Sequence, residues 1–109
     1  MQVTEINSKR KKRFSEFADE PKILDGAKAR IDDILNQEIE FIGSKIAESK
    51  FSKNKSGKCL TLQFIDPKTG ERRVVFTGSD VLINQLEKYH EKLPFLATIK
   101  RVDRYYLLT

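Results

Sequence analysis

The segment VVFTGSDVLINQLEKYH, residues 74–90, passes directly from a strand-like run to a helical one. Its first residues are β-branched and aromatic, and Gly78 then ends the strand. Ser79 suits the N-terminal cap of a helix that runs from Asp80 to about Lys92. The apolar residues at helical spacing are Leu82, Ile83, Leu86, Tyr89 and Leu93. The fold must therefore bury one face of a helix that directly follows a strand.

Strand-like runs lie on both sides of this helix. They cover residues 38–46, 59–65, 71–77, 95–102 and 105–109. Gly43 interrupts the first run, which predicts a bulge or a sharp bend there. The turn sequence DPKTG at 66–70 predicts a hairpin of the second and third strands.

A further helix is expected before the first strand, in ILDGAKARIDDILNQ at 23–37. Asp25 can cap its first turn, and its apolar face would hold Ala27, Ile31, Ile34 and Leu35. The order after this helix is β-β-β-α-β-β, which predicts a mainly β protein with a five-stranded OB-fold barrel. The alternative is an open antiparallel sheet with both helices packed on one face.

A chain of 109 residues predicts one folded domain. We assign residues 21–109 to this domain and residues 1–20, with the run KRKKR, to a flexible basic arm. The arm fits a nucleic-acid-binding tail and a solvated terminus equally well. A lone cysteine, Cys59, suits a reducing cytoplasm, and no apolar run reaches the ~18 residues of a membrane span. We therefore expect a cytoplasmic protein that does not enter membranes.

The sequence lacks the residue patterns of an enzyme. It contains no CxxC, HExxH or GxGxxG motif, and its only histidine, His90, lies near the end of the predicted helix. Cys59 has no histidine nearby in sequence, and Asp32 and Asp33 read as a solvated helix face. We expect no enzymatic activity, no metal and no cofactor.

The basic charge of the chain is concentrated in the middle. Residues 44–73 carry eight basic against three acidic side chains, which indicates a polyanionic ligand or else a basic solubilising surface. OB-folds bind oligonucleotides on their second and third strands and on the loops after the first and fourth strands. The candidate nucleic-acid-binding residues on those elements are Lys50, Phe51, Lys53, Lys55, Lys58, Thr61, Gln63, Arg72, Arg73, Lys100, Arg101, Arg104 and Tyr105.

Cations on such a surface would pair with phosphates, and flat side chains would stack on unpaired bases. The stacking candidates are Phe51 and one of the adjacent Tyr105 and Tyr106, of which Tyr105 lies nearer the loop. We assign Phe64, Phe76 and Phe95 to the core. The outer face of the hairpin would then hold Thr61, Gln63, Arg73, Val75 and Thr77, which do not form a set that reads particular bases.

Four stretches carry a family resemblance. They are KILDGAKARIDDILNQEI (22–39), CLTLQF (59–64), VFTGSDVLINQLE (75–87) and LPFLATIKRVDRYYLL (93–108). In these the chain resembles small single-stranded-DNA-binding proteins encoded by phages and prophages of Gram-positive bacteria. The resemblance implies an OB-fold that coats single strands in DNA replication or recombination within the host cytoplasm. The chain has no tryptophan at stacking positions and no long acidic C-terminal tail, unlike the bacterial housekeeping binders.

Other functions and assemblies remain open. The first is a protein-interaction module, a phage factor that modulates a host protein through the 23–37 helix. The same basic surface would also allow RNA binding. Small OB-fold binders often join several sites, so we expect a homo-oligomer, with a dimer the first choice.

Overall fold

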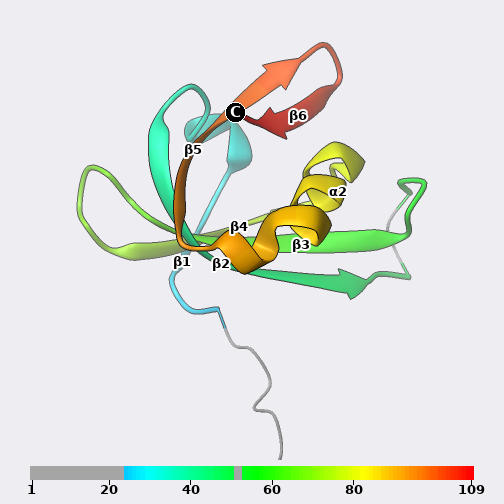
Figure 1. The fold of residues 1–109 in the computed structure, drawn as a ribbon, viewed down its shortest axis with the longest axis horizontal. Helices are drawn as coiled ribbons and strands as arrows, with labels where there is room; N and C mark the ends of the chain where they lie inside the picture. Colours follow the sequence, from blue (N-terminus) through cyan, green and yellow to red (C-terminus); the bar gives the residue numbers. More distant parts are fainter. Residues whose placement is uncertain (1–23, 51–52) are drawn as a thin grey trace, which may run out of the picture.

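The computed structural model describes residues 24–50 and 53–109, so the predicted basic arm at 1–20 lies outside the described residues. The elements are β1 (Ala27–Ala29), η1 (Ile31–Asp33), β2 (Glu38–Glu48), β3 (Lys58–Ile65), β4 (Arg72–Thr77), α2 (Asp80–Tyr89), η2 (His90–Lys92), β5 (Phe95–Val102) and β6 (Tyr105–Leu108). They are drawn in Figure 1. The mainly β fold expected from the sequence is confirmed, and each of the five predicted strands is present.

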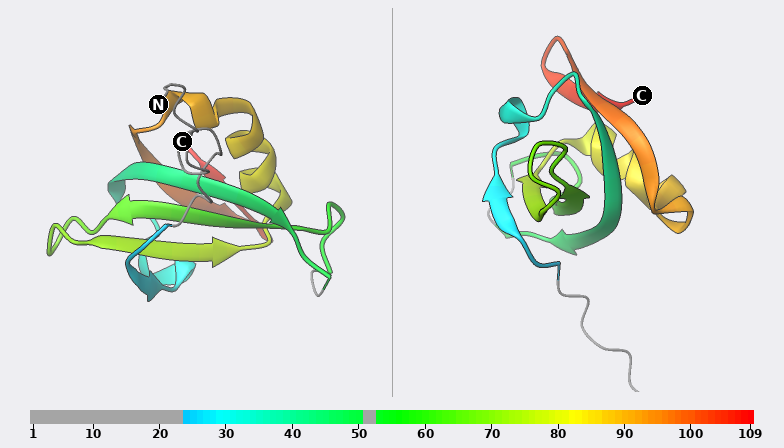
Figure 2. Two further views of the ribbon diagram at one scale, coloured as in Figure 1. Left: turned by 90° about the horizontal axis from the view of Figure 1, so that it is seen from below. Right: turned by 90° about the vertical axis from the view of Figure 1, so that its left-hand side faces the viewer.

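The six strands form one curled sheet in the order β1-β4-β3-β2-β5-β6. β1 runs parallel to β4, and all other neighbours are antiparallel. The right-hand view of Figure 2 shows the sheet wrapping around its interior. β2 pairs with β5 at one end and with β3 along the rest of its length, and its register shifts between Phe41 and Gly43. The bulge predicted at Gly43 is therefore confirmed, and it lets β2 belong to both halves of the sheet.

The sheet is open and is not closed into a barrel. Closure would require β4 to pair with β6, but β1 lies on the outer edge of β4. The free edge of β6 is covered by side chains of α2 and its cap. Gln85 accepts from Leu108 N–H at 2.8 Å and donates to Leu108 O at 3.1 Å. The Ser79 hydroxyl donates to Tyr106 O at 3.4 Å.

The prediction of a helix at 23–37 is wrong. Residues 27–29 form β1, and only the single 3-10 turn η1 follows. An isolated helix of this length is marginal in water, whereas β4 offers an unpaired edge that residues 27–29 occupy. Gly26, at φ 127°, turns the chain onto that edge. The alternative function that relied on this helix loses its element.

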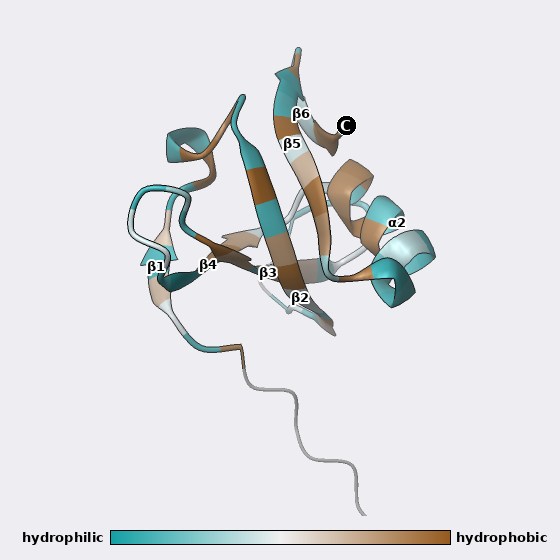
Figure 3. Cartoon of the chain, turned by 60° about the vertical axis from the view of Figure 1, so that its left-hand side comes forward, coloured by the Kyte–Doolittle hydropathy of each residue, from teal (hydrophilic) through white to brown (hydrophobic). Residues whose placement is uncertain are grey.

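The helix predicted after Gly78 is confirmed as α2, with Ser79 as its N-cap. The Ser79 hydroxyl accepts from Leu82 N–H at 3.5 Å. Leu82, Ile83 and Leu86 are fully buried against the concave side of the sheet, here called the inner face. The cartoon in Figure 3 colours parts of α2 and of the neighbouring β5 as hydrophobic and residues toward the tip of the β5–β6 hairpin as hydrophilic. Tyr89, expected in the apolar stripe, is instead 47% exposed because it lies at the last residue of the helix.

The inner face of the sheet holds the core. Its largest fully buried side chains on the strands are Ile39, Phe41, Leu60, Leu62, Phe64, Val75 and Ile99. Phe64 therefore lies in the core as predicted, and Phe95 is half-buried against it. The opposite side of β2, β3 and β4, here called the outer face, carries the alternate side chains.

Candidate nucleic-acid interface

One row of side chains crosses the outer face from β2 to β4. Lys45 lies opposite Thr61, and Thr61 lies opposite Phe76. The Phe76 side chain is 46% exposed, and Lys28 Nζ on β1 lies 5.3 Å from the centre of its ring. These four residues, Lys28, Lys45, Thr61 and Phe76, are called the Phe76 face. This face presents one exposed aromatic ring with an ammonium group over it and a second lysine in the same cross-strand row.

The sequence placed Phe76 in the core and Val75 on the outer face, and both assignments are wrong. Arg73 and Thr77, also assigned to the outer face, pair with the core residues Phe64 and Leu60, so they too lie on the other side of the strand. The β3–β4 hairpin pairs Leu62 with Val75 and Thr61 with Phe76, so Val75 faces the core with Leu62. Two consecutive valines hide the alternation of this strand. The turn at 66–70 contained the information needed to place Phe76 correctly. If Ile65 pairs with Arg72 across that turn, Phe76 lies opposite the polar Thr61 and faces outward.

The other end of the outer face is crossed by the segment before β1. Gln63 donates from Nε2 to Asp25 O at 2.9 Å and to Asp25 Oδ1 at 2.7 Å. Arg72 pairs with Asp25 at 3.1 Å. A methyl group at Gly43 would come within 2.9 Å of the Leu24 side chain. Gln63 and Arg72, both candidate ligand contacts, are therefore engaged within the protein.

Arg73 is also engaged. Its guanidinium pairs with Asp66 at 3.3 Å and donates to Lys28 O at 3.2 Å. A backbone hydrogen bond from Lys68 and the Arg73 contact hold the pKa of Asp66 below its ordinary value. Both arginines lie at the start of β4, at the opposite end of that strand from Thr77, which lines a cleft with Arg104 and Tyr105.

Asn54 organises the part of the β2–β3 connection that the structure describes next to β3. Asn54 accepts from Gly57 N–H at 3.0 Å and donates to Lys58 O at 2.9 Å and to Gly78 O at 2.7 Å. The described cations Lys50, Lys53 and Lys55 of this connection, together with Lys58 at the first residue of β3, are here called the lysine loop. The first three are exposed. Phe51 lies outside the described residues, and its stacking role stays a prediction.

The lysine loop is tied to the start of α2. Asp80 Oδ2 accepts from Lys55 N–H at 3.0 Å, and Asp80 Oδ1 accepts from the Ser56 hydroxyl at 2.6 Å. The hydrogen bond from Ser56 holds the pKa of the Asp80 carboxyl below its ordinary value. Lys58 pairs with Glu87 of α2 at 2.9 Å, and this hydrogen bond raises the lysine pKa.

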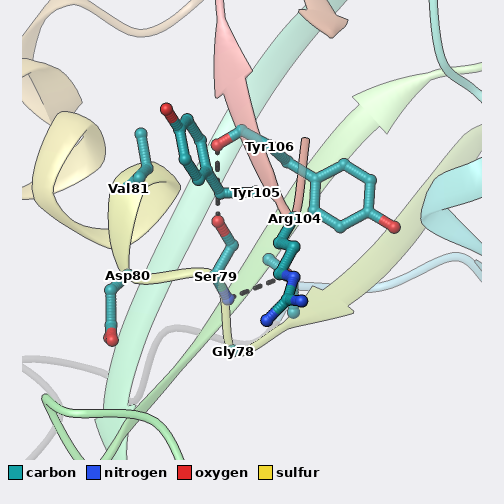
Figure 4. A pocket seen from close by; sticks show the side chains of 8 residues that line it. Gly78, Ser79, Asp80, Val81, Arg104, Tyr105 and Tyr106 are labelled. Carbon is teal, nitrogen blue, oxygen red and sulfur yellow. Dashed lines mark hydrogen bonds between the residues drawn. The ribbon is translucent and has the colours of Figure 1, made fainter. Parts of the chain in front are cut away.

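The β5–β6 hairpin approaches the same junction from the other side. An open cleft of about 510 Å³ is lined by Thr77, Gly78, Ser79, Asp80, Val81, Arg104, Tyr105 and Tyr106. In Figure 4 the Tyr105 ring lies beside Val81, and the Arg104 side chain extends toward Gly78. Arg104 makes no hydrogen bond or ion pair with any residue in the described part of the chain. We call this feature the Tyr105 cleft.

The two neighbouring tyrosines point to opposite sides. Tyr105 is 46% exposed, whereas the Tyr106 hydroxyl donates to Asp32 at 2.8 Å, which raises the Tyr106 pKa. The Arg101 guanidinium lies 5.7 Å from the centre of the Tyr106 ring. Tyr105 is thus the accessible ring of the pair. Lys100, also a candidate, is exposed on β5.

The segment Gly78–Asp80 therefore lies between the lysine loop and the β5–β6 hairpin. It bonds to the loop through Gly78 and Asp80 and to β6 through Ser79. In Figure 1, α2 lies between the β2–β3 hairpin and the β5–β6 hairpin. The structure thus brings together the loop cations, Arg104 and Tyr105, with the Phe76 face beginning one residue before the junction at Thr77.

Other chemistry finds little support among the described residues. No group of three or more His, Cys, Asp or Glu side chains in residues 24–50 and 53–109 is arranged to hold a metal ion. Within the same residues, no helix has the length and apolar character needed to cross a membrane. Cys59 is half-buried near the start of β3.

Comparison with known proteins gives one match. A family model described as a domain of unknown function (DUF8468) covers residues 25–109. No curated protein and no solved structure matches the chain.

Proposed function

The chain belongs to the DUF8468 family, and we propose that it binds single-stranded DNA without enzymatic activity and without strong sequence preference. The Phe76 face, the lysine loop and the Tyr105 cleft would form the interface. The bound strand would place phosphates on the cations and unpaired bases on the rings of Phe76 and Tyr105. Each stacked base contributes about 1–3 kcal/mol to such binding.

One observation carries this proposal. Phe76 is a large apolar side chain left half exposed on a sheet face, with Lys28 over its ring and Lys45 in the same cross-strand row. An aromatic ring among cations suits a ligand that has flat bases and a charged backbone. A sugar ligand would gain nothing from the cations, and a core position would not leave the ring in solvent.

The arrangement of the strands supports the same ligand. Strands β2 to β6, with α2 between β4 and β5, follow the chain order of an OB-fold. In that order β3 and β4 are the second and third strands, whose exposed face binds oligonucleotides together with the loops after the first and fourth strands. We propose that this sheet is an open variant of the OB barrel.

The biological role follows from the resemblance in sequence. We propose that the protein coats single strands during phage or prophage DNA replication or recombination in the cytoplasm of a bacterial host. RNA is a possible second ligand of the same surface, which competition between matched DNA and RNA oligomers would test. Two or more copies, most simply a dimer, would add their sites on one strand.

Salt dependence tests the proposal. Fluorescence anisotropy with a labelled oligo-dT should detect binding at low salt, and log K should fall with log[salt] at a slope of roughly −3 to −4. This slope corresponds to about 4–6 phosphate contacts at ~0.7 per contact. No binding at low salt, or an affinity that does not change with salt, would refute it.

A charge-matched pair of variants locates the contacts. Changing Lys53 and Lys55 together to glutamine should flatten the slope by about 1.4, the share of two phosphate contacts. The control changes Lys88 and Lys92, which lie outside all three surfaces, and alters the net charge equally. Equal effects from the two pairs would mean that binding depends on total charge rather than on the lysine loop.

A further inference from the structure

Asp80 is an acidic residue in the middle of a surface that otherwise suits a polyanion. Asp80 is one of the residues that line the Tyr105 cleft, and its carboxylate contacts the lysine loop. If charge alone governed binding, removing Asp80 would strengthen the binding of DNA, because a negative group repels phosphate. The contacts of Asp80 indicate the opposite outcome.

We propose that Asp80 is a positioning residue that holds the lysine loop in its DNA-binding conformation, an inference that rests on the proposed function. Its two oxygens accept from Lys55 N–H at 3.0 Å and from the Ser56 hydroxyl at 2.6 Å. Both oxygens are therefore turned toward the loop. The carboxylate fixes the backbone from which the Lys53 and Lys55 ammonium groups extend.

The connection to α2 makes this anchor rigid. Asp80 is the first residue of α2, and Leu82, Ile83 and Leu86 of that helix are fully buried. The adjacent Ser79 donates to Tyr106 O, and Gly78 O accepts from Asn54. Three consecutive residues, Gly78, Ser79 and Asp80, thus hold the loop and the β5–β6 hairpin against one core element. A bound strand would meet both walls of the cleft already in place.

Ordering the loop in advance lowers the cost of binding. Fixing the backbone of a loop residue costs conformational entropy, and a loop released from Asp80 would have to be ordered by the ligand instead. We expect this cost to exceed the gain from removing one exposed charge, because such charges are screened by solvent and salt. Asp80 therefore favours phosphate binding despite its sign.

The test compares two acidic residues near the lysine loop. Asp80→Ala should weaken oligo-dT binding by roughly three- to tenfold, since it frees the backbone of one or more loop residues. The control is Glu48→Ala, at the end of β2, which removes the same charge but no hydrogen bond within the described residues. Glu48→Ala should leave affinity unchanged or slightly raised. An Asp80→Ala protein that binds more tightly than the wild type would overturn the proposal.

Conservative variants separate loop order from folding. Asp80→Asn keeps an acceptor oxygen and should recover part of the lost affinity. Ser56→Ala would remove the bond to Asp80 and also the bond that the Ser56 hydroxyl accepts from Lys58 N–H at 3.2 Å, so the asparagine variant is the one that isolates the carboxylate. Thermal unfolding confirms that each variant is folded, because loss of an acidic residue from the first turn also affects α2. Equal losses for Asp80→Asn and Asp80→Ala would contradict a role through hydrogen bonding.

A readout without DNA keeps the two proposals distinct. Hydrogen exchange at the Lys55 amide should be faster in the Asp80→Ala protein and unchanged in the Glu48→Ala protein. Unchanged exchange in Asp80→Ala would refute the positioning role even if the wild type binds DNA. A wild type that binds no oligo-dT would refute the proposed function, while faster exchange would still establish that Asp80 orders the loop.

Discussion

Replacement of Phe76 by alanine is expected to weaken binding to oligo-dT about 5- to 150-fold, the equivalent of ~1–3 kcal/mol for one stacked base. The ring is 46% exposed and lies outside the core cluster, so its removal should change the free energy of unfolding by less than about 1 kcal/mol. Anisotropy titrations at fixed salt measure the affinity, and urea unfolding measures the stability. The salt slope should stay the same, because no phosphate contact is removed.

Tyr89 supplies a matched control for this variant. It is 47% exposed, and Lys88 Nζ lies 5.4 Å from the centre of its ring, so it has the same combination of aromatic ring and ammonium group as Phe76. It lies at the end of α2, away from the proposed interface. Tyr89→Ala should therefore leave affinity unchanged. Similar losses in the two variants would show that the Phe76 face is not a specific stacking site.

The largest expected effect on stability comes from Gly26→Ala. Gly26 has φ 127°, and a methyl group there would overlap the backbone carbonyl of Arg72. The backbone conformation costs roughly 1–3 kcal/mol for a residue with a side chain, and overpacking adds a further ~1–3 kcal/mol. We expect β1 to detach from β4 and the midpoint of urea unfolding to fall accordingly.

A substitution at Gly70 measures the cost of the backbone conformation without the cost of overpacking. Gly70 also has a positive φ, 74°, but a methyl group there would have no atom within 4 Å. Gly70→Ala should therefore show only the backbone cost, about 1 kcal/mol. If Gly26→Ala proves no more destabilising than Gly70→Ala, the close approach of residue 26 to β4 does not contribute to stability.

The elements that the sequence predicted correctly are those with a local cause. The cap at Ser79, the stripe of Leu82 and Leu86 and the bulge at Gly43 each depend on residues that are neighbours in the chain. Local spacing also predicted that only one of Tyr105 and Tyr106 would be exposed, because neighbouring residues on a strand face opposite ways. These features need no knowledge of distant partners.

The features that were missed depend on contacts between distant segments. Residues 27–29 carry a helical pattern, yet they pair with β4, more than forty positions away. Gln63 has an outward position in its strand but is 7% exposed because Asp25 crosses over it. Phe76 was assigned to the wrong side because a one-residue difference in hairpin register exchanges the two faces of a strand. No local pattern in the sequence encodes the pairing of residues 27–29 with β4 or the crossing of Asp25 over Gln63, whereas the turn at 66–70 did contain the register that places Phe76.

Gln85 has a consequence for self-association. Its amide occupies both backbone groups of Leu108, so the outermost strand of the sheet cannot serve there as a template for a strand of another molecule. We expect successive copies along a nucleic acid to remain separate sheets, without a continuous ladder of main-chain bonds between them. A filament of this protein would then come apart when its DNA is digested, instead of persisting as an aggregate.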